Sequence, residues 1–391
     1  MKKSFRKLLC LALAVVMVTS VFTACSKKKD NAAKKDTFYI GGMGPISGSA
    51  AVYGTAVKNA AQLAVDEINA AGGINGYKIA FNFVDDEADK EKGINAYNVL
   101  KEWGMQMVMG AVTSGSCVAV ADKADIDGMF LLTPSGSAVE CITSETAFQV
   151  CFNDPNQGAA SATYIGENDL AEKVAVIYDS SDVYSSGIYE KFMSQAKADK
   201  KFEVVYEGSF TKDNNSDFSV QLTAAKDSGA TLVFLPIYYS EASSILTQAD
   251  SMGYDPKFFG CDGLDGILTV ENFNLELAEG VLLLTPFAAD ATDDKTVNFV
   301  TKYKEKYNET PNQFAADAYD AIYIIKAAIE NAKVTPDMDI DEIGEKLATA
   351  MTKISFDGLT GEDMTWTADG AVNKAPKAVV IEDGVYVSYS K

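Results

Sequence analysis

The 391-residue chain contains no histidine. This absence excludes serine–histidine triads, histidine-ligated zinc sites and imidazole proton shuttles. The serines therefore lack their usual catalytic base, so an extracellular hydrolase is the weakest candidate function. The glycine-rich segments fit no phosphate-binding fingerprint, and the run of Asp337, Asp339 and Asp341 lacks the glycine and distal glutamate of a calcium loop. We expect no enzyme activity, no metal and no cofactor.

Positive charge is scarce. Thirty-four lysines and arginines face 55 aspartates and glutamates, and the formal net charge is −21. Four of the basic residues lie among the first seven residues, and without them the charge is −25. Such a body repels nucleic acid and anionic lipid, so we expect neither as a partner.

Cysteine is also infrequent, and two of the six cysteines belong to the N-terminal segment. The remaining four are Cys117, Cys141, Cys151 and Cys261. Their irregular spacing is typical of neither a zinc site nor a dense disulfide framework. A single bridge, such as Cys141 to Cys151, stays open at this point.

The uncharged run from Leu8 to Phe22 is shorter than the roughly 20 apolar residues that span a bilayer. Basic residues precede it and Ala24-Cys25 follows it, a pattern typical of a lipoprotein signal peptide over residues 1–24. Cys25 would then carry the lipid. An ordinary signal peptide or membrane anchor, with Cys25 incidental, is the alternative. The polar residues 25–36 predict a flexible tether.

From residue 37 onward, short β-branched and aromatic runs alternate with alanine-rich helical stretches. This alternation is typical of parallel α/β layers. About 355 residues follow the tether, more than one hydrophobic core usually spans, so we expect two doubly wound lobes. A non-periodic stretch at 148–155 and a boundary near 285–286 would separate them. A strand-like stretch over 378–388 is predicted to close the chain.

Polar loops follow two predicted strands at the edge where ligands bind in open α/β sheets. The strand 106–110 leads to Ser114, and the strand 129–132 leads to Ser135-Gly136-Ser137. Hydroxyl and backbone N–H groups there suit a carboxylate. The plainer interpretation of each loop is a helix cap or a turn.

Strand ends in the second half carry Tyr184, Tyr238 and Asp262. Tyrosine offers an apolar face with a hydroxyl, and the aspartate can pair with an ammonium. Together with the hydroxyls of the first half, these side chains predict a site for a small zwitterion.

Several motifs resemble the leucine/isoleucine/valine-type substrate-binding proteins of ABC transporters. They are Gly44–Gly48 (GPISG), Ala64–Gly76 (AVDEINAAGGING), Thr133-Pro134, Asp154–Gly158 (DPNQG) and Ala318–Ala321 (AYDA). The resemblance implies an α/β periplasmic-binding-protein type I fold, with two doubly wound parallel-sheet lobes joined by three hinge crossovers. The N-terminal lobe would comprise 37–153 and 286–373, and the C-terminal lobe 154–285 and 374–391.

The resemblance also implies roles for nine residues. Ser114, Ser135, Gly136 and Ser137 would receive an amino acid's α-carboxylate. Tyr238 and Asp262 would hold its α-ammonium, and Tyr53, Tyr184 and Phe314 would line the side-chain pocket. Asp262 stands where the family commonly has glutamate, and Gln149 where many relatives have arginine, which leaves the side-chain preference open.

The function implied is capture of an α-amino acid, branched and aliphatic, outside the cytoplasmic membrane for delivery to an ABC permease and its ATPase. The protein would be a monomer, lipid-anchored at the surface of a single-membrane bacterium rather than in a periplasm. The same fold could instead bind an aromatic acid, an amide, a urea-like solute or a sugar, or serve as a sensing module for a receptor.

Overall fold

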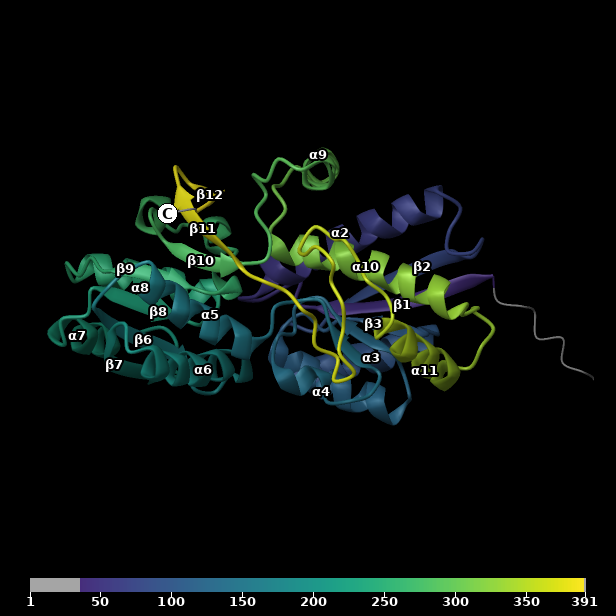
Figure 1. Ribbon diagram of the computed structural model, residues 1–391, viewed down its shortest axis with the longest axis horizontal. Helices are drawn as coiled ribbons and strands as arrows, with labels where there is room; N and C mark the ends of the chain where they lie inside the picture. Colours follow the sequence, from purple (N-terminus) through teal and green to yellow (C-terminus); the bar gives the residue numbers. More distant parts are fainter. Residues whose placement is uncertain (1–35, 390–391) are drawn as a thin grey trace, which may run out of the picture. The chain divides into compact units, whose positions relative to one another are not determined.

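The computed structural model describes residues 36–389, and their strands form two sheets (Figure 1). The first sheet is entirely parallel, in the order β2-β1-β3-β4-β5. Its strands are β1 (Thr37–Gly44), β2 (Lys78–Asp85), β3 (Met107–Met109), β4 (Leu131–Thr133) and β5 (Ala147–Gln149). Strands β3 to β5 are buried throughout, as expected when helices cover both faces of a parallel sheet.

Six helices accompany the first sheet. They are α2 (Ala51–Ala70), α3 (Lys90–Trp103), α4 (Ser114–Ile126), α9 (Asp294–Tyr307), α10 (Gln313–Ala332) and α11 (Ile340–Met351). The side chain of Asp89 caps α3 by accepting bonds from Glu91 N and Lys92 N, and left-handed Gly104 ends that helix. A short 3₁₀ turn, η1 (Val139–Ile142), contacts α4 and β5.

The second sheet has the order β12-β11-β10-β9-β8-β6-β7. Its strands are β6 (Lys173–Asp179), β7 (Glu203–Phe210), β8 (Leu232–Leu235), β9 (Lys257–Gly260), β10 (Leu282–Thr285), β11 (Lys377–Glu382) and β12 (Val385–Ser388). Its helices are α5 (Asp154–Glu167), α6 (Val183–Asp199), α7 (Ser219–Asp227) and α8 (Tyr239–Ser251). Three 3₁₀ turns, η2 (Asp262–Leu264), η3 (Ile267–Thr269) and η4 (Leu275–Ala278), separate β9 from β10.

The strand-like stretch predicted over 378–388 contains two strands rather than one continuous strand. Strands β11 and β12 form an antiparallel hairpin, and β11 also pairs antiparallel with β10. The chain reverses at Asp383-Gly384, where both residues have positive φ angles of 52° and 72°. An Asp-Gly pair between two apolar runs favours this tight turn. The second sheet is therefore mixed rather than purely parallel.

The chain passes between the two sheets three times: after β5, after β10, and between α11 and β11 (Figure 1). This arrangement is the α/β fold that the resemblance implied. The described residues nevertheless belong to one compact unit. The boundaries of the two lobes therefore stay a prediction.

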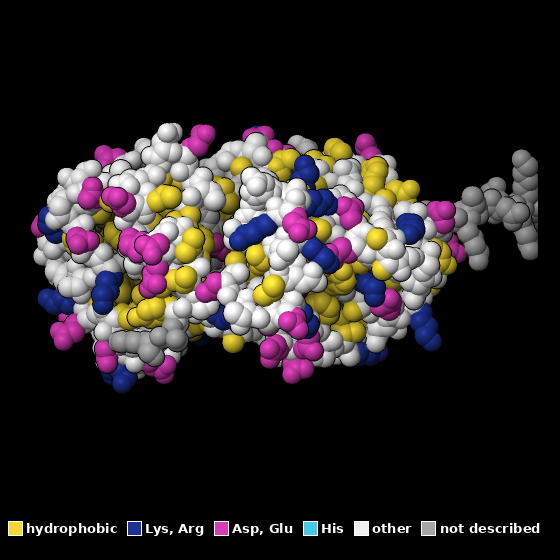
Figure 2. Space-filling model, turned by 90° about the horizontal axis from the view of Figure 1, so that it is seen from above, with side chains coloured by type: hydrophobic (Ala, Val, Ile, Leu, Met, Phe, Trp, Pro, Cys, Tyr) yellow, Lys and Arg dark blue, Asp and Glu magenta, His cyan; other side chains and the backbone are white. Residues whose placement is uncertain are grey.

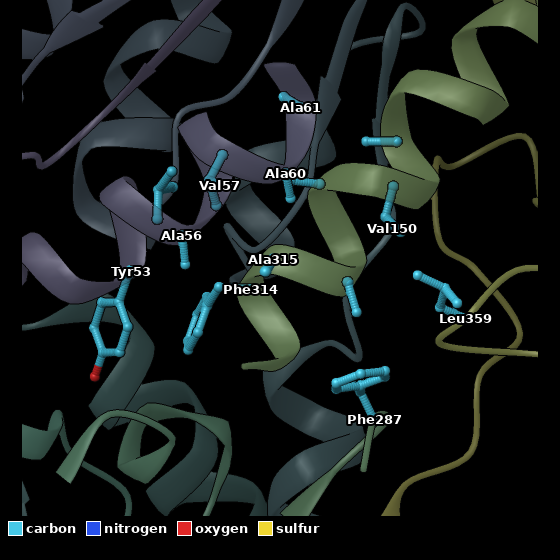
Figure 3. Close-up of a cluster of buried hydrophobic side chains, with 14 of the residues drawn as sticks. Tyr53, Ala56, Val57, Ala60, Ala61, Val150, Phe287, Phe314, Ala315 and Leu359 are labelled. Carbon is cyan, nitrogen blue, oxygen red and sulfur yellow. The ribbon is translucent and has the colours of Figure 1, made fainter. Parts of the chain in front are cut away.

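Close packing of α2 against α10 positions two aromatic side chains of the later site. Small buried residues, including Ala60, Ala61 and Ala315, let the two helices approach (Figure 3). Tyr53 lies in the first turn of α2 and Phe314 in the first turn of α10. The contact therefore brings their rings together at one end of the helix pair.

The four cysteines of the described residues are buried and free, so no Cys141–Cys151 bridge forms in this structure. The signal peptide, Cys25 and most of the predicted tether lie outside the described residues. Within residues 36–389, no helix is both long and apolar enough to cross a bilayer. Acidic and basic side chains are interspersed over the face that Figure 2 shows.

Candidate functional site

A narrow cavity lies between loops that follow strands of the two sheets, and side chains nearly fill it, leaving a free volume of about 10 Å³. It is lined by Tyr53, Val112, Thr113, Ser114, Ser135, Tyr184, Tyr238, Asp262, Gly263 and Phe314. Seven of the nine predicted site residues are therefore brought together. Gly136 and Ser137 are not among the lining residues.

Hydroxyl groups occupy the side of the cavity that belongs to the first sheet. Ser114, the first residue of α4, accepts bonds at its Oγ from the backbone N–H groups of Ser137 (3.1 Å) and Ala138 (3.2 Å). Ser135 donates its hydroxyl to the Val112 carbonyl at 2.8 Å. The loops after β3 and β4 are thus tied together by the same serines that line the cavity.

Gly136 has a packing role that the sequence did not reveal. Its N–H donates to Thr133 Oγ1 at 2.7 Å, so this N–H already has a partner within the loop. A Cβ at Gly136 would lie 2.8 Å from Cys117 Cβ and from Cys117 Sγ. No larger residue fits there without displacing α4.

Thr113 lines the cavity but was missed by the sequence interpretation. It occupies the N-cap position of α4, yet its side chain makes no capping bond. Its hydroxyl is buried and has no hydrogen-bond partner within the described residues. A buried hydroxyl without a partner is costly, so Thr113 is a ready donor or acceptor for a bound molecule. The only signal in the sequence was a threonine next to Ser114.

Aromatic rings form the middle of the cavity. The rings of Tyr53 and Phe314 lie next to each other (Figure 3), and their centroids are 4.2 Å apart. Tyr238 packs edge-on against Tyr53 at 5.5 Å and is stacked on Tyr184 at 4.9 Å. Tyr184 belongs to the first turn of α6 rather than to the loop before it. The rings provide an apolar wall between two polar ends.

Asp262 provides the carboxylate at the opposite end. Only 3 % of the residue is exposed, and its Oδ1 accepts a bond of 2.7 Å from the Tyr184 hydroxyl. Burial raises the pKa of Asp262 to about 6, although the Tyr184 hydroxyl favours the charged form. Among residues 36–389, no lysine or arginine lines the cavity. A ligand ammonium would be the natural partner of this carboxylate.

Tyr53 connects the two sides of the cavity directly. Its hydroxyl donates to the Gly263 carbonyl and accepts a bond of 3.2 Å from Tyr239 N–H. Burial raises the pKa of Tyr53 well above its usual value, so this phenol remains protonated. Helix α2 is therefore linked to the loops after β8 and β9 in the closed arrangement described here.

The chemistry of the cavity suits a small zwitterion with an apolar side chain. Hydroxyl groups lie at one end, a buried carboxylate at the other, and aromatic rings lie between them. No group of three or more acidic, cysteine or histidine side chains suitable for a metal ion occurs among residues 36–389. That each predicted residue contacts a ligand stays a prediction.

A family model described as periplasmic binding protein matches residues 37–384. Among curated proteins, the Leu/Ile/Val-binding protein homolog 3 of Brucella melitensis is 31% identical over 302 residues, which cover 76% of this chain and 80% of the relative.

Two solved structures share the fold over 90% of this chain. The leucine-binding protein of Thermotoga maritima superposes with a TM-score of 0.81 at 25% identity, over 98% of its own chain. The branched-chain amino acid substrate-binding protein of Streptococcus pneumoniae, solved with isoleucine, gives a TM-score of 0.80 at 31% identity, over 97% of its chain.

Proposed function

Because the chain belongs to the periplasmic binding protein family, we propose that it captures a branched-chain aliphatic α-amino acid and delivers it to an ABC permease and its ATPase. The observation that carries this proposal is the cavity, whose lining combines hydroxyl groups from the loops after β3 and β4, the buried Asp262 carboxylate from the loop after β9, and aromatic rings. Burying either charge of an amino acid without a partner would cost several kcal/mol.

The polar ends fix the orientation of the ligand. Its carboxylate binds at Thr113, Ser114 and the neighbouring 135–137 loop, and its ammonium binds at Asp262 beside Tyr238. Its side chain lies against Tyr53 and Phe314. Members of this family bind solutes and are not enzymes, and we propose that this chain likewise does no chemistry on its ligand.

Isothermal titration of the protein from residue 26 onward tests this function. We expect leucine, isoleucine and valine to bind more tightly than polar and charged amino acids, because aromatic rings line the middle of the cavity. Benzoate, urea and a simple amide serve as controls, since they lack the ammonium. Heat from one of these controls, with none from any amino acid, would overturn the proposal.

We further propose that the protein acts as a monomer outside the cytoplasmic membrane, anchored by a lipid on Cys25, a residue outside the described range. Replacement Cys25→Ser should move the protein from the membrane fraction to the medium and leave its ligand affinity unchanged, because the cavity lining that the structure describes runs from Tyr53 to Phe314. Cell fractionation with immunoblotting measures the release. Retention of the C25S variant in the membrane would contradict the anchor.

A further inference from the structure

The Tyr184 hydroxyl has two hydrogen-bond partners in the cavity, and their chemistry fixes its direction. The Gly263 N–H donates to Tyr184 Oη at 2.9 Å. A backbone N–H cannot accept, so the phenolic proton is directed to the other partner, Asp262 Oδ1, at 2.7 Å. The three groups form a one-way chain from Gly263 N–H through Tyr184 to the carboxylate.

The surrounding packing holds this chain rigidly. Tyr184 is 2 % exposed, and its ring is stacked on Tyr238 with an angle of 21° between the planes. A Cβ at Gly263 would lie 2.6 Å from the Tyr184 hydroxyl oxygen and 2.6 Å from the Ile237 carbonyl oxygen. Glycine at this position therefore allows the close approach of η2 to the first turn of α6.

Backbone contacts hold Asp262 as well. Its N–H donates to Gln157 Oε1 of α5 at 3.3 Å. The backbone of Asp262 is thus held by Gln157, and its carboxylate is held by the Tyr184 hydroxyl. Asp262 Oδ1 accepts the Tyr184 hydroxyl, and Gln313 and Gln157 are further groups whose interaction favours the charged carboxylate.

We propose that Tyr184 is a positioning residue for the ammonium site: its hydroxyl orients the Asp262 carboxylate, and it does not select the ligand's side chain. This inference rests on the proposed function. It also explains how a side chain as short as aspartate can form the ammonium site, since a fixed carboxylate loses no rotamer freedom on binding.

Other titratable groups influence Asp262 and must be considered in any pH experiment. Burial is the main cause of its raised pKa, and Asp317 of α10 adds to it. The remaining groups that interact electrostatically with Asp262 are Tyr53, Cys151, Asp154, Tyr184, Tyr238, Cys261 and Asp265. Among these and Asp317, Tyr184 is the one that donates a side-chain hydrogen bond to the carboxylate.

The test is titration of the Tyr184→Phe variant with leucine, isoleucine and valine between pH 5 and pH 8.5. A hydrogen bond to a charged group supports an affinity loss of roughly tenfold at pH 7.5. Without the hydroxyl the charged form of Asp262 is less favoured, so the pH below which affinity falls should rise by about one unit. The ratios among the three affinities should not change.

The opposite pattern would overturn the inference: altered leucine, isoleucine and valine ratios with an unmoved pH profile would make Tyr184 a side-chain contact. Tyr189→Phe, one turn further along α6, removes a hydroxyl that bonds Glu207 and should change neither property. If Tyr184→Phe does not fold, Gly263→Ala tests the same point by displacing the hydroxyl, and an unmoved pH profile there would contradict the proposal. Failure of the wild type to bind any amino acid would instead reject the proposed function.

Discussion

Replacement of Asp262 by alanine should weaken binding of a branched-chain amino acid by roughly 200- to 5,000-fold, because the ligand ammonium would be buried without its partner. Asp262 is buried, and it is the one carboxylate that lines the cavity within the described part of the chain. Isothermal titration at pH 7.5 measures the loss. Binding of a ligand without an ammonium should be little affected.

Titration of the wild type with pH provides an independent check of the same carboxylate. The ionised form binds the ammonium, so affinity should be constant well above the pKa of about 6 and fall about tenfold for each pH unit below it. The Asp262→Asn variant should bind the amino acid weakly, and its affinity should not fall further as the pH is lowered below about 6. Asp250→Ala removes an exposed carboxylate from α8 and serves as the matched control. Full affinity in the Asp262→Ala variant would show that the ammonium binds elsewhere.

Replacement of Lys374 by alanine should lower the free energy of unfolding by about 3–5 kcal/mol. Lys374 Nζ lies 2.9 Å from Asp317 Oδ1, and both side chains are fully buried. The same Nζ donates to Thr360 Oγ1 at 2.6 Å. This ion pair links the segment between α11 and β11 to α10. Its loss leaves the Asp317 carboxylate buried without a cation. Urea unfolding of the ligand-free protein measures the change.

Two variants make the Lys374 experiment specific. The double variant Asp317→Leu with Lys374→Met should recover most of the stability, because an apolar pair carries no unpaired charge. Lys346→Ala breaks an exposed pair with Glu342 on α11 and should cost no more than about 0.5 kcal/mol. If Lys374→Ala lowers the free energy of unfolding by less than about 1 kcal/mol, water reaches the site and the ion pair is not a buried one.

Much of the fold could be predicted because its signals are local. A short aromatic and apolar run predicts a strand over 38–43, and apolar residues at spacings of three and four predict a helix over 53–71; the structure has them at 37–44 and 51–70. Strand β5 was missed, because its residues adjoin and overlap the stretch 148–155, whose sequence favours a non-periodic boundary between the lobes. The strand-like stretch 378–388 is a hairpin, and the Asp383-Gly384 pair between its two apolar runs is the local signal for the turn.

Some residues of the candidate site could likewise be located from local sequence signals, and others could not. Ser114, Tyr238 and Asp262 could be located from the sequence because each follows a predicted strand, where parallel sheets place their ligands. The unpartnered hydroxyl of Thr113 could not, since a threonine before a helix normally caps it and only the structure shows that this one does not. The roles of all the lining residues remain predictions until binding is measured.

The sequence by itself determined the kinds of group present: no imidazole, an acidic body, hydroxyls after strands of the first half, and tyrosines with an aspartate after strands of the second. Only the tertiary structure decided which groups meet. Tyr184 and Asp262 are 78 positions apart, and their bond exists because α6 and η2 pack around Gly263. Local periodicity specifies helices and strands, whereas the direction of a hydroxyl depends on neighbours that packing supplies.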